Sequence, residues 1–284
     1  MNGMPTLPAC VGSVRRQTHR EWEHLVQDGG STDGTVDWLS RQTGLNWRSG
    51  KDGGMYDAIN QAWARSTGDI LSWLNADEQY LPETLEIVRR HFESDPNTDA
   101  VFGDCILVTP EGRPLAARKE IPLRGWYAVN GTLYVQSCTL FCRRRMVERF
   151  GGFDTSFRIA GDKEWILRLY YGGARFRHVP AYLALFSSDG GNLSLHPAMK
   201  PESVRIRERF SAFRVRPLRL IPRFFRTAEK LCRGCYGWHR VRYEHTKNET
   251  GCSEEVRAAV GSRWMWPKRN EEETAARGRL RGGA

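Results

Sequence analysis

The sequence has 284 residues, of which 40% are hydrophobic and 27% charged, and its formal net charge is +10 at pH 7. These totals fit a soluble globular chain with one large domain, or one domain and an appendage. They exclude a membrane-spanning protein, because no apolar run is long enough, and residues 1–14 lack the features of a secretory signal. Seven cysteines, an odd number, argue against a disulfide framework, so we expect a reduced, cytoplasmic setting.

Apolar spacing and turn residues predict alternating helices and strands in the first half of the chain. The expected elements are a helix over Leu7–Gln17, a strand over Trp22–Gln27, a helix over Val36–Gln42, a helix from Met55 to about Ser66, a buried strand from Leu71, a helix over Pro82–Glu93, a strand over Ala100–Val108 and its hairpin partner over Pro114–Arg118. The alternation predicts an α/β fold with a doubly wound, mostly parallel, Rossmann-like sheet.

A turn rich in glycine and hydroxyl residues, Asp28 to Thr35, joins the first predicted strand to the next helix. Glycines in such a turn let backbone N–H groups approach a ligand closely, and Asp28 can accept hydrogen bonds from a ribose or a base. A tight turn with Asp33 as a helix cap would explain the same residues. The density of Gly, Ser and Asp favours a binding role.

The stretch from Leu71 to Tyr80 is apolar at first and then carries Asn75, Asp77 and Glu78. In open α/β sheets, ligands bind outside the carboxyl ends of strands. Carboxylates at that position can hold a hard divalent cation, which neutralises a diphosphate. A strand followed by an acidic turn without function is the alternative.

Several motifs in order resemble the family 2 glycosyltransferases of the GT-A fold. They are the turn at Asp28–Thr35, the loop and helix start at Lys51–Asn60, the acidic segment Asn75–Glu78, Gln136-Ser137-Cys138, Gly151-Gly152-Phe153-Asp154 and Ala160-Gly161-Asp162. The resemblance covers roughly residues 2–194. It implies an inverting transfer of a sugar from a nucleotide-diphosphate sugar to an acceptor hydroxyl, in cell-surface polysaccharide or glycolipid synthesis.

The resemblance also implies roles for single residues. Asp28, Gly29, Asp52, Asn75 and Asp77 match donor-binding positions, and Asp77 is expected to ligate Mn²⁺ or Mg²⁺ next to the diphosphate. His196 is a further metal candidate, although an isolated surface histidine is the alternative.

An inverting displacement needs a general base for the acceptor proton. The resemblance implies that Asp162 is this base, with Glu164 as the alternate. Without the resemblance, a helix cap is the favoured interpretation of Asp162. Gln136 and Asp154 are expected on the acceptor side of the site.

The chain departs from the family pattern in two places. It starts where the family's first strand normally ends, so we expect either that the true start lies upstream or that the pocket lacks this strand's contribution. Asn75 also occupies the first position of the family's acidic motif, where an Asp is usual. Relatives whose motif has the form Asn-x-Asp-Asp also carry Asn at this position.

The positive charge is concentrated near the C-terminus. Arg214 to Arg242 holds nine Lys/Arg and one acid, which accounts for +8 of the +10. We expect a GT-A domain over residues 1–198, a basic amphipathic helical region over 199–250 and a disordered tail over 251–284. The basic region suits an anionic membrane surface at the cytoplasmic face of the plasma membrane, or equally a solvated helix packed on the domain.

Nucleic acid is not an expected partner, because no base-reading module accompanies the basic segment. Cys232 and Cys235 form one Cys-x-x-Cys without a second well-spaced pair, which is weak support for zinc. The expected partners are the sugar nucleotide and a saccharide or lipid-linked acceptor. The main alternative is a non-catalytic, glycosyltransferase-like binding protein.

Overall fold

The computed structural model describes residues 1–131, 133–188, 196–210 and 220–262. The helices are α1 (Leu7–Arg15), α2 (Thr35–Ser40), α3 (Met55–Arg65), α4 (Thr84–Ser94), α5 (Gly125–Asn130), α6 (Arg144–Phe150), α7 (Gly161–Tyr171), α8 (Met199–Phe210) and α9 (Leu220–Cys232), with the 3-10 turn η1 (Ser137–Thr139). The strands are β1 (Leu25–Asp28), β2 (Asn46–Ser49), β3 (Ile70–Ser72), β4 (Gln79–Tyr80), β5 (Ala100–Val108), β6 (Pro114–Arg118), β7 (Leu140–Arg143), β8 (Phe176–Ser187), β9 (Trp238–Thr246) and β10 (Ser253–Gly261).

The central sheet has six strands and is mixed, so the prediction of a mostly parallel sheet is wrong. Its order is β3-β7-β5-β8-β4, with β6 paired to β5. Among its pairs, β5–β8 is parallel, whereas β3–β7, β5–β7, β4–β8 and β5–β6 are antiparallel. The alternation of predicted elements did not include β7, a run of four residues with no turn residues to mark it. This strand lies between β3 and β5 and is antiparallel to both.

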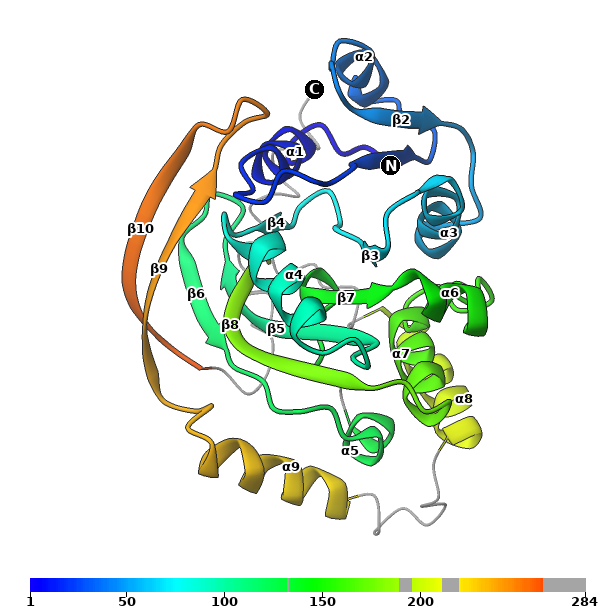
Figure 1. The fold of residues 1–284 in the computed structure, drawn as a ribbon, viewed down its shortest axis with the longest axis vertical. Coiled ribbons are helices and arrows are strands. Elements are labelled where there is room, and N and C mark those ends of the chain that lie inside the picture. The colour runs from blue at the N-terminus through cyan, green and yellow to red at the C-terminus, as the bar shows by residue number, and fades with distance from the viewer. Residues whose placement is uncertain (132, 189–195, 211–219, 263–284) are drawn as a thin grey trace, which may run out of the picture.

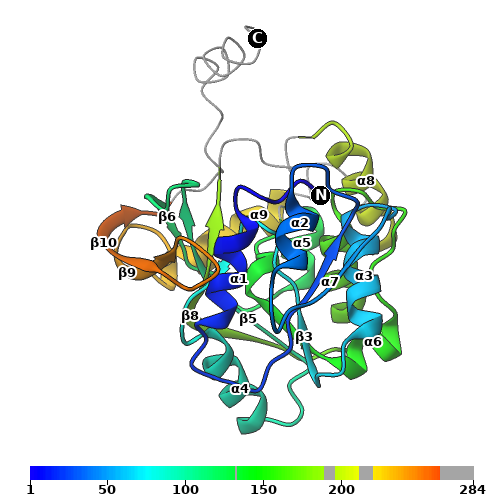
Figure 2. The same cartoon turned by 90° about the horizontal axis from the view of Figure 1, so that it is seen from above.

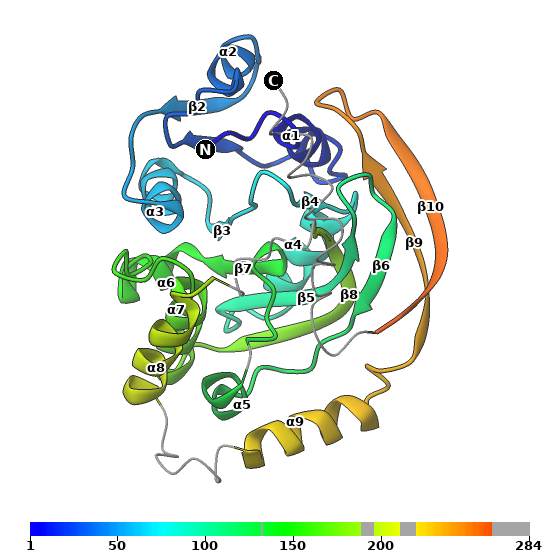
Figure 3. The same cartoon turned by 180° about the vertical axis from the view of Figure 1, so that it is seen from behind.

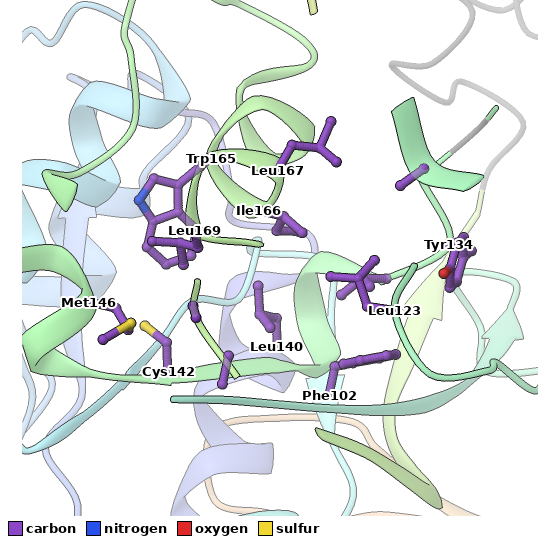
Figure 4. Close-up of a cluster of buried hydrophobic side chains, with 14 of the residues drawn as sticks. Phe102, Leu123, Tyr134, Leu140, Cys142, Met146, Trp165, Ile166, Leu167 and Leu169 are labelled. Carbon is purple, nitrogen blue, oxygen red and sulfur yellow. The ribbon is translucent and has the colours of Figure 1, made fainter. Parts of the chain in front are cut away.

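Both faces of the sheet are covered, as the predicted alternation requires. Successive residues of a strand point to opposite faces. Phe102 and Leu140 therefore join the cluster formed with α7, while Val101 and Phe141 join the cluster formed with Val88 and Phe92 of α4. Figure 4 shows Trp165, Ile166 and Leu169 of α7 directed toward the side chains of the sheet.

Strands β1 and β2 form a separate parallel two-stranded sheet. Figure 1 shows it beside α1 and α3, at the end of the molecule opposite α9. A cavity of about 470 Å³ lies between this pair and the central sheet, lined by β1 residues such as Leu25, by Trp63 of α3 and by β3. Within the described residues, no strand pairs with β1 on this side.

The C-terminal region differs from the predicted helical extension and disordered tail. Helices α8 and α9 are followed by the antiparallel hairpin β9–β10, which Figures 1 and 2 show on the flank beside β6. Val241 and Tyr243 alternate with exposed residues, which is a strand pattern, and the Tyr243 hydroxyl donates to the Gly112 carbonyl at 2.6 Å. Residues 263–284 of the predicted tail lie outside the described residues.

The hairpin is also fixed to the main domain at β4. The Gln79 amide donates to the Thr246 carbonyl at 3.0 Å and accepts from the Thr246 N–H at 2.9 Å. Within the part of the chain that the structure describes, none of the helices is long and apolar enough to cross a bilayer.

Candidate active site

Asp28 ends β1 and holds the glycine-rich turn in shape. Its Oδ2 accepts hydrogen bonds from the N–H groups of Gly30 and Ser31 at 3.1 and 2.9 Å and from the Ser49 hydroxyl at 2.6 Å. Burial raises the pKa of the Asp28 carboxyl, but these bonds and the Ser31 hydroxyl together lower it below its usual range. The side chain is only 4% exposed, so Asp28 shapes the turn from within.

Gly29 brings the turn against the loop that contains Asp52. A Cβ atom on Gly29 would lie 2.7 Å from Asp52 Oδ2, closer than real contacts allow. Asp52 Oδ1 accepts a hydrogen bond from the Gly54 N–H at 2.9 Å, just before α3 begins. The structure thus brings Asp28, Gly29 and Asp52 together, and their role in binding a nucleotide stays a prediction.

Gly3 connects this turn to the acidic segment. Its N–H donates to Thr35 Oγ1 at 3.1 Å, and a Cβ atom on it would lie 3.4 Å from Ala76 Cβ. Asn2 adds two bonds to the same turn, donating to Ser31 Oγ at 2.5 Å and accepting from the Thr32 N–H at 3.0 Å. The first residues of the chain therefore join the Asp28 turn to the Asn75–Asp77 segment.

The acidic segment is a compact turn with one carboxylate outside and one inside. The Asn75 N–H donates to Glu78 Oε2 at 2.8 Å, and the Glu78 N–H donates to the Asn75 carbonyl at 3.0 Å. Burial and the charge of Asp77 raise the pKa of Glu78 to about 8. Asp77 is exposed, so its oxygens lie at the surface of the site.

This donor set fits a divalent cation. Mg²⁺ is usually held by one or two carboxylates, with waters and substrate phosphates completing its shell. Asp77 offers such an oxygen donor beside a second carboxyl, and positive charge there would offset the repulsion between the two acids. In the described residues, no group of three or more His, Cys, Asp or Glu side chains could enclose a metal.

His196 follows the undescribed residues 189–195 and is exposed. Its Nδ1 accepts a hydrogen bond from the Ala198 N–H at 3.1 Å, which shapes the turn before α8. Its role as a metal ligand stays a prediction. All seven cysteines of the chain lie in the described residues and are free, and the Cys235 thiol donates to the Glu120 carbonyl.

Asp162 stands in the first turn of α7 and does not act as its cap. The N-cap residue is Ala160, which makes no side-chain cap bond. Asp162 Oδ1 accepts from the Lys163 N–H at 2.7 Å and from the Tyr56 hydroxyl at 3.3 Å. Burial raises the pKa of the Asp162 carboxyl, and the two hydrogen bonds offset this only in part. A carboxylate of raised pKa suits proton transfer near neutral pH.

Glu164, the alternate base, is fully buried and held by two cations. Its carboxylate lies 3.0 Å from Arg168 Nη2 and 2.9 Å from Arg209 Nη1. A buried carboxylate with two guanidinium partners ties α7 to α8. This arrangement favours Asp162 over Glu164 as the proton acceptor.

Gln136 and Asp154 lie on two loops next to these groups. Gln136 is buried immediately before η1, where the Ser137 hydroxyl lies 3.4 Å from Glu78 Oε1. Asp154 follows Phe153, whose N–H and carbonyl both bond the Asn60 amide of α3, at 2.8 and 2.9 Å. The first loop thus adjoins the acidic turn, and the second is fixed to α3.

Sequence reasoning missed Glu202 of α8. Its carboxylate accepts backbone hydrogen bonds from Arg158, Ile159 and Ala160 at 2.7, 3.0 and 2.7 Å, and its side chain is buried. These bonds hold the segment that leads into Asp162. No local pattern marks Glu202, because its partners lie more than 40 residues earlier in the chain.

Residues 1–151 match the family described as Glycosyl transferase family 2. The chain belongs to this family. It is 34% identical over 175 residues to an uncharacterised glycosyltransferase of Mycobacterium tuberculosis (strain ATCC 25618 / H37Rv), covering 59% of this chain and 64% of the relative. It is 29% identical over 203 residues to a PGL/p-HBAD biosynthesis glycosyltransferase of Mycobacterium bovis (strain BCG / Pasteur 1173P2), covering 67% of this chain and 75% of the relative.

Two solved structures share the fold of this family 2 chain. S. aureus TarS residues 1–349 in complex with UDP-GlcNAc matches with a TM-score of 0.57 and 18% identity, over 68% of this chain and 58% of that chain. The mannosyltransferase PcManGT from Pyrobaculum calidifontis, in complex with GDP-Man and Mn²⁺, matches with a TM-score of 0.51 and 19% identity, over 80% of this chain and 72% of that chain. The chain therefore has an α/β fold with a mixed central sheet, of the GT-A type.

Proposed function

We propose that this chain transfers a sugar from a nucleotide-diphosphate sugar to an acceptor hydroxyl with inversion. The observation that carries the proposal is the exposed Asp77 carboxylate, in a segment that Gly3 joins to the Asp28 turn, where Gly29 packs against Asp52. An oxygen donor for a cation thus lies beside a loop whose backbone can approach a nucleotide. TarS with UDP-GlcNAc and PcManGT with GDP-Man are donor complexes of the same fold.

In the donor half of the site, the Asp28 turn and Asp52 contact the nucleotide, while Asn75 and Asp77 lie toward the diphosphate. Mn²⁺ or Mg²⁺, when bound by Asp77 and the phosphate oxygens, supplies positive charge that stabilises the departing diphosphate. His196 is a second candidate ligand. Glu78, buried beneath Asp77 and bonded to the Asn75 N–H, keeps the turn in the conformation that exposes Asp77.

In the acceptor half, Asp162 takes the proton of the acceptor hydroxyl. The acceptor oxygen then bonds to the anomeric carbon as the bond from that carbon to the diphosphate oxygen breaks, and the nucleotide diphosphate leaves with the electron pair. Gln136 and Asp154 position the acceptor from the loops before η1 and before α7. Tyr56 orients Asp162 by its hydroxyl contact with Asp162 Oδ1. Glu202 orients it by holding the backbone that precedes Asp162.

The name of one relative supports a proposal for the acceptor class. The M. bovis relative is named for PGL/p-HBAD biosynthesis, and we extend this to a saccharide or lipid-linked acceptor in cell-surface glycolipid or polysaccharide synthesis. Such an acceptor is used in the cytoplasm, at the inner face of the plasma membrane.

A thermal-shift screen of UDP-GlcNAc, GDP-Man and other sugar nucleotides, with and without Mn²⁺, tests donor and cation together. A ligand that binds only the folded state raises its apparent stability. We expect one donor class to raise the melting temperature in the presence of Mn²⁺, and Asp77→Ala to remove the Mn²⁺-dependent part and to abolish turnover. Glu148→Ala, at an exposed acid of α6, should change neither. Full turnover by Asp77→Ala would refute the assignment.

A second candidate function is donor binding without transfer. The observation that favours it is the cavity between the β1–β2 pair and β3, since the two donor-side segments at Asp28 and Asp77 are carried by separate sheets. Tight donor binding without release of a nucleotide diphosphate, over a broad acceptor screen, would favour this candidate.

A further inference from the structure

Helix α9 presents its apolar side to solvent and its charged side to the protein. Of the nine large hydrophobic side chains that are exposed in the described residues, six lie between Leu220 and Trp238. Leu220, Phe224 and Leu231 are spaced to share one helix face, and they are 62%, 71% and 56% exposed. Globular proteins normally turn such a face inward.

The opposite side of α9 is fixed to the domain by charged contacts. Lys230 is buried and its Nζ lies 2.5 Å from Oε2 of Glu120, a carboxylate with no exposure. Glu229 accepts two hydrogen bonds from Arg124, at 2.8 and 3.1 Å, and one from the Tyr127 hydroxyl at 3.1 Å.

Arg226 completes this inner side, with its guanidinium over the Tyr134 ring at 5.9 Å. Arg226, Glu229 and Lys230 stand at helical spacing on one face. Rotating the helix to bury its phenylalanines would take Lys230 away from the buried Glu120 carboxylate. Glu120 would then keep only Arg118, whose Nε lies 3.8 Å away, which is unfavourable. The outward orientation of the apolar face is therefore built into the fold.

The surroundings of the apolar face carry positive charge. Arg223 of α9 and Arg233 directly after it are exposed, as is Arg240, which stands two residues beyond Trp238 on β9. Figures 1 and 3 show α9 beyond α5 at the outer edge of the molecule, at the end opposite the β1–β2 pair. A helix at the edge of the molecule exposes its apolar side chains in one row along its axis. Such a row fits a flat surface, such as a membrane, better than it fits a convex protein surface.

We propose that α9, together with Trp238, docks the protein on an anionic lipid surface. The exposed aromatic and aliphatic side chains would enter the boundary between headgroups and acyl chains, while the arginines contact acidic headgroups. This surface extends the proposed function by bringing the enzyme to a lipid-linked acceptor. It rests on that function only for the acceptor, because lipid binding needs neither donor nor turnover.

The test is flotation of the full chain with vesicles of phosphatidylcholine containing about one third phosphatidylglycerol. Wild type should float, and Phe224→Ser/Leu231→Ser should lower the partition constant at least about tenfold, because two exposed apolar side chains are lost. Arg223→Gln/Arg240→Gln should lower it about tenfold and reduce its salt dependence. Val204→Ser, at an exposed residue of α8, is the matched control and should bind like wild type.

All four residues changed on the α9 surface are exposed, so the variants should unfold at the wild-type temperature, which thermal denaturation checks. Wild-type protein that stays with the soluble fraction, or equal flotation of wild type and Phe224→Ser/Leu231→Ser, would overturn the proposal. A concentration-dependent dimer in light scattering that the same double substitution abolishes would also overturn it, in favour of a second copy on α9. Failure of sugar transfer in these assays would leave flotation unchanged, so the two hypotheses are separable.

Discussion

The Tyr56 hydroxyl donates to the Ile159 carbonyl at 2.8 Å and lies 3.3 Å from Asp162 Oδ1. It thereby links the start of α3, which follows the Asp52 loop, to the carboxylate at the start of α7. Gly161 makes this approach possible, because a Cβ atom there would lie 2.6 Å from the Tyr56 ring. The donor-side loop and the proposed base are thus held by one side chain.

Tyr56→Phe should shift the pH dependence of transfer. The hydroxyl shares its one hydrogen between the Ile159 carbonyl and Asp162 Oδ1. The contact with Asp162 lowers the pKa of that carboxyl, so its loss should raise the pKa further. The acidic limb of kcat/KM should move to higher pH by up to about one unit. Rates of nucleotide diphosphate release across pH measure this, with Tyr171→Phe, an exposed tyrosine of α7, as control. An unchanged limb would mean that Tyr56 does not tune the base.

Glu202→Gln should weaken both stability and turnover. A neutral amide offers one acceptor oxygen in place of a carboxylate that bonds three backbone N–H groups, so we expect a loss of about 1–3 kcal/mol in the free energy of unfolding. Because those groups lead into Asp162, kcat should fall while the donor affinity stays near wild type. Glu208→Gln, at an exposed residue of the same helix, should alter neither value in urea unfolding and steady-state kinetics. If Glu202→Gln and Glu208→Gln had the same stability and the same kcat, Glu202 would not be needed to hold the segment before Asp162.

Gly29→Ala should impair donor binding more than folding. The new Cβ would meet the carboxylate end of Asp52, a side chain that can move aside, so the melting temperature should change little. Displacing Asp52 should weaken donor binding about tenfold if it contacts the nucleotide. Gly50→Ala is the matched control, because nothing lies within 4 Å of its Cβ position. Calorimetric titration with the donor identified in the thermal-shift screen measures the affinity of each variant. Equal donor affinities of Gly29→Ala and Gly50→Ala would show that Gly29 and Asp52 do not line the donor pocket.

Lys163 should give stability a distinct alkaline dependence. Burial lowers the pKa of Lys163 from its ordinary 10.5 to about 8, with Nζ donating to the Gly131 carbonyl at 2.8 Å. Between these two pH values the unfolded chain binds more protons than the folded one, so stability rises with pH there. The gain is on the order of 3 kcal/mol.

Lys163→Met removes the titrating group, so wild type should gain stability relative to this variant between pH 8 and pH 10.5. Urea unfolding at several pH values measures the difference, and Lys200→Met, at an exposed lysine of α8, should show no such change. A constant difference between wild type and Lys163→Met would contradict a lowered pKa.

Local patterns predicted the elements that surround the site. The strand over Ala100–Val108 and the helix from Met55 were placed correctly, because β-branched residues and helical spacing are properties of short windows. The turn at Asp28 and the acidic turn at Asp77 were also visible, because glycines and carboxylates cluster within a few residues.

Features that depend on distant partners were not predictable in this way. The antiparallel insertion of β7 is decided by its pairing with Leu71 and Val101, and the position of the β9–β10 hairpin by contacts to Gln79 and Gly112. The orientation of α9 follows from the buried Lys230–Glu120 pair, 110 residues apart in the chain. Sequence spacing indicates that a helix is amphipathic, but not which side faces the protein.

Steady-state sugar transfer by Asp162→Asn, with the donor identified by thermal shift and Mn²⁺ present, tests the central claim most directly. The amide keeps the size of the carboxylate but cannot take a proton from the acceptor. We expect transfer to fall at least about a hundredfold while donor affinity, measured by calorimetry, stays within about threefold of wild type. Transfer at the wild-type rate would show that Asp162 is not the base and would contradict this account of the site.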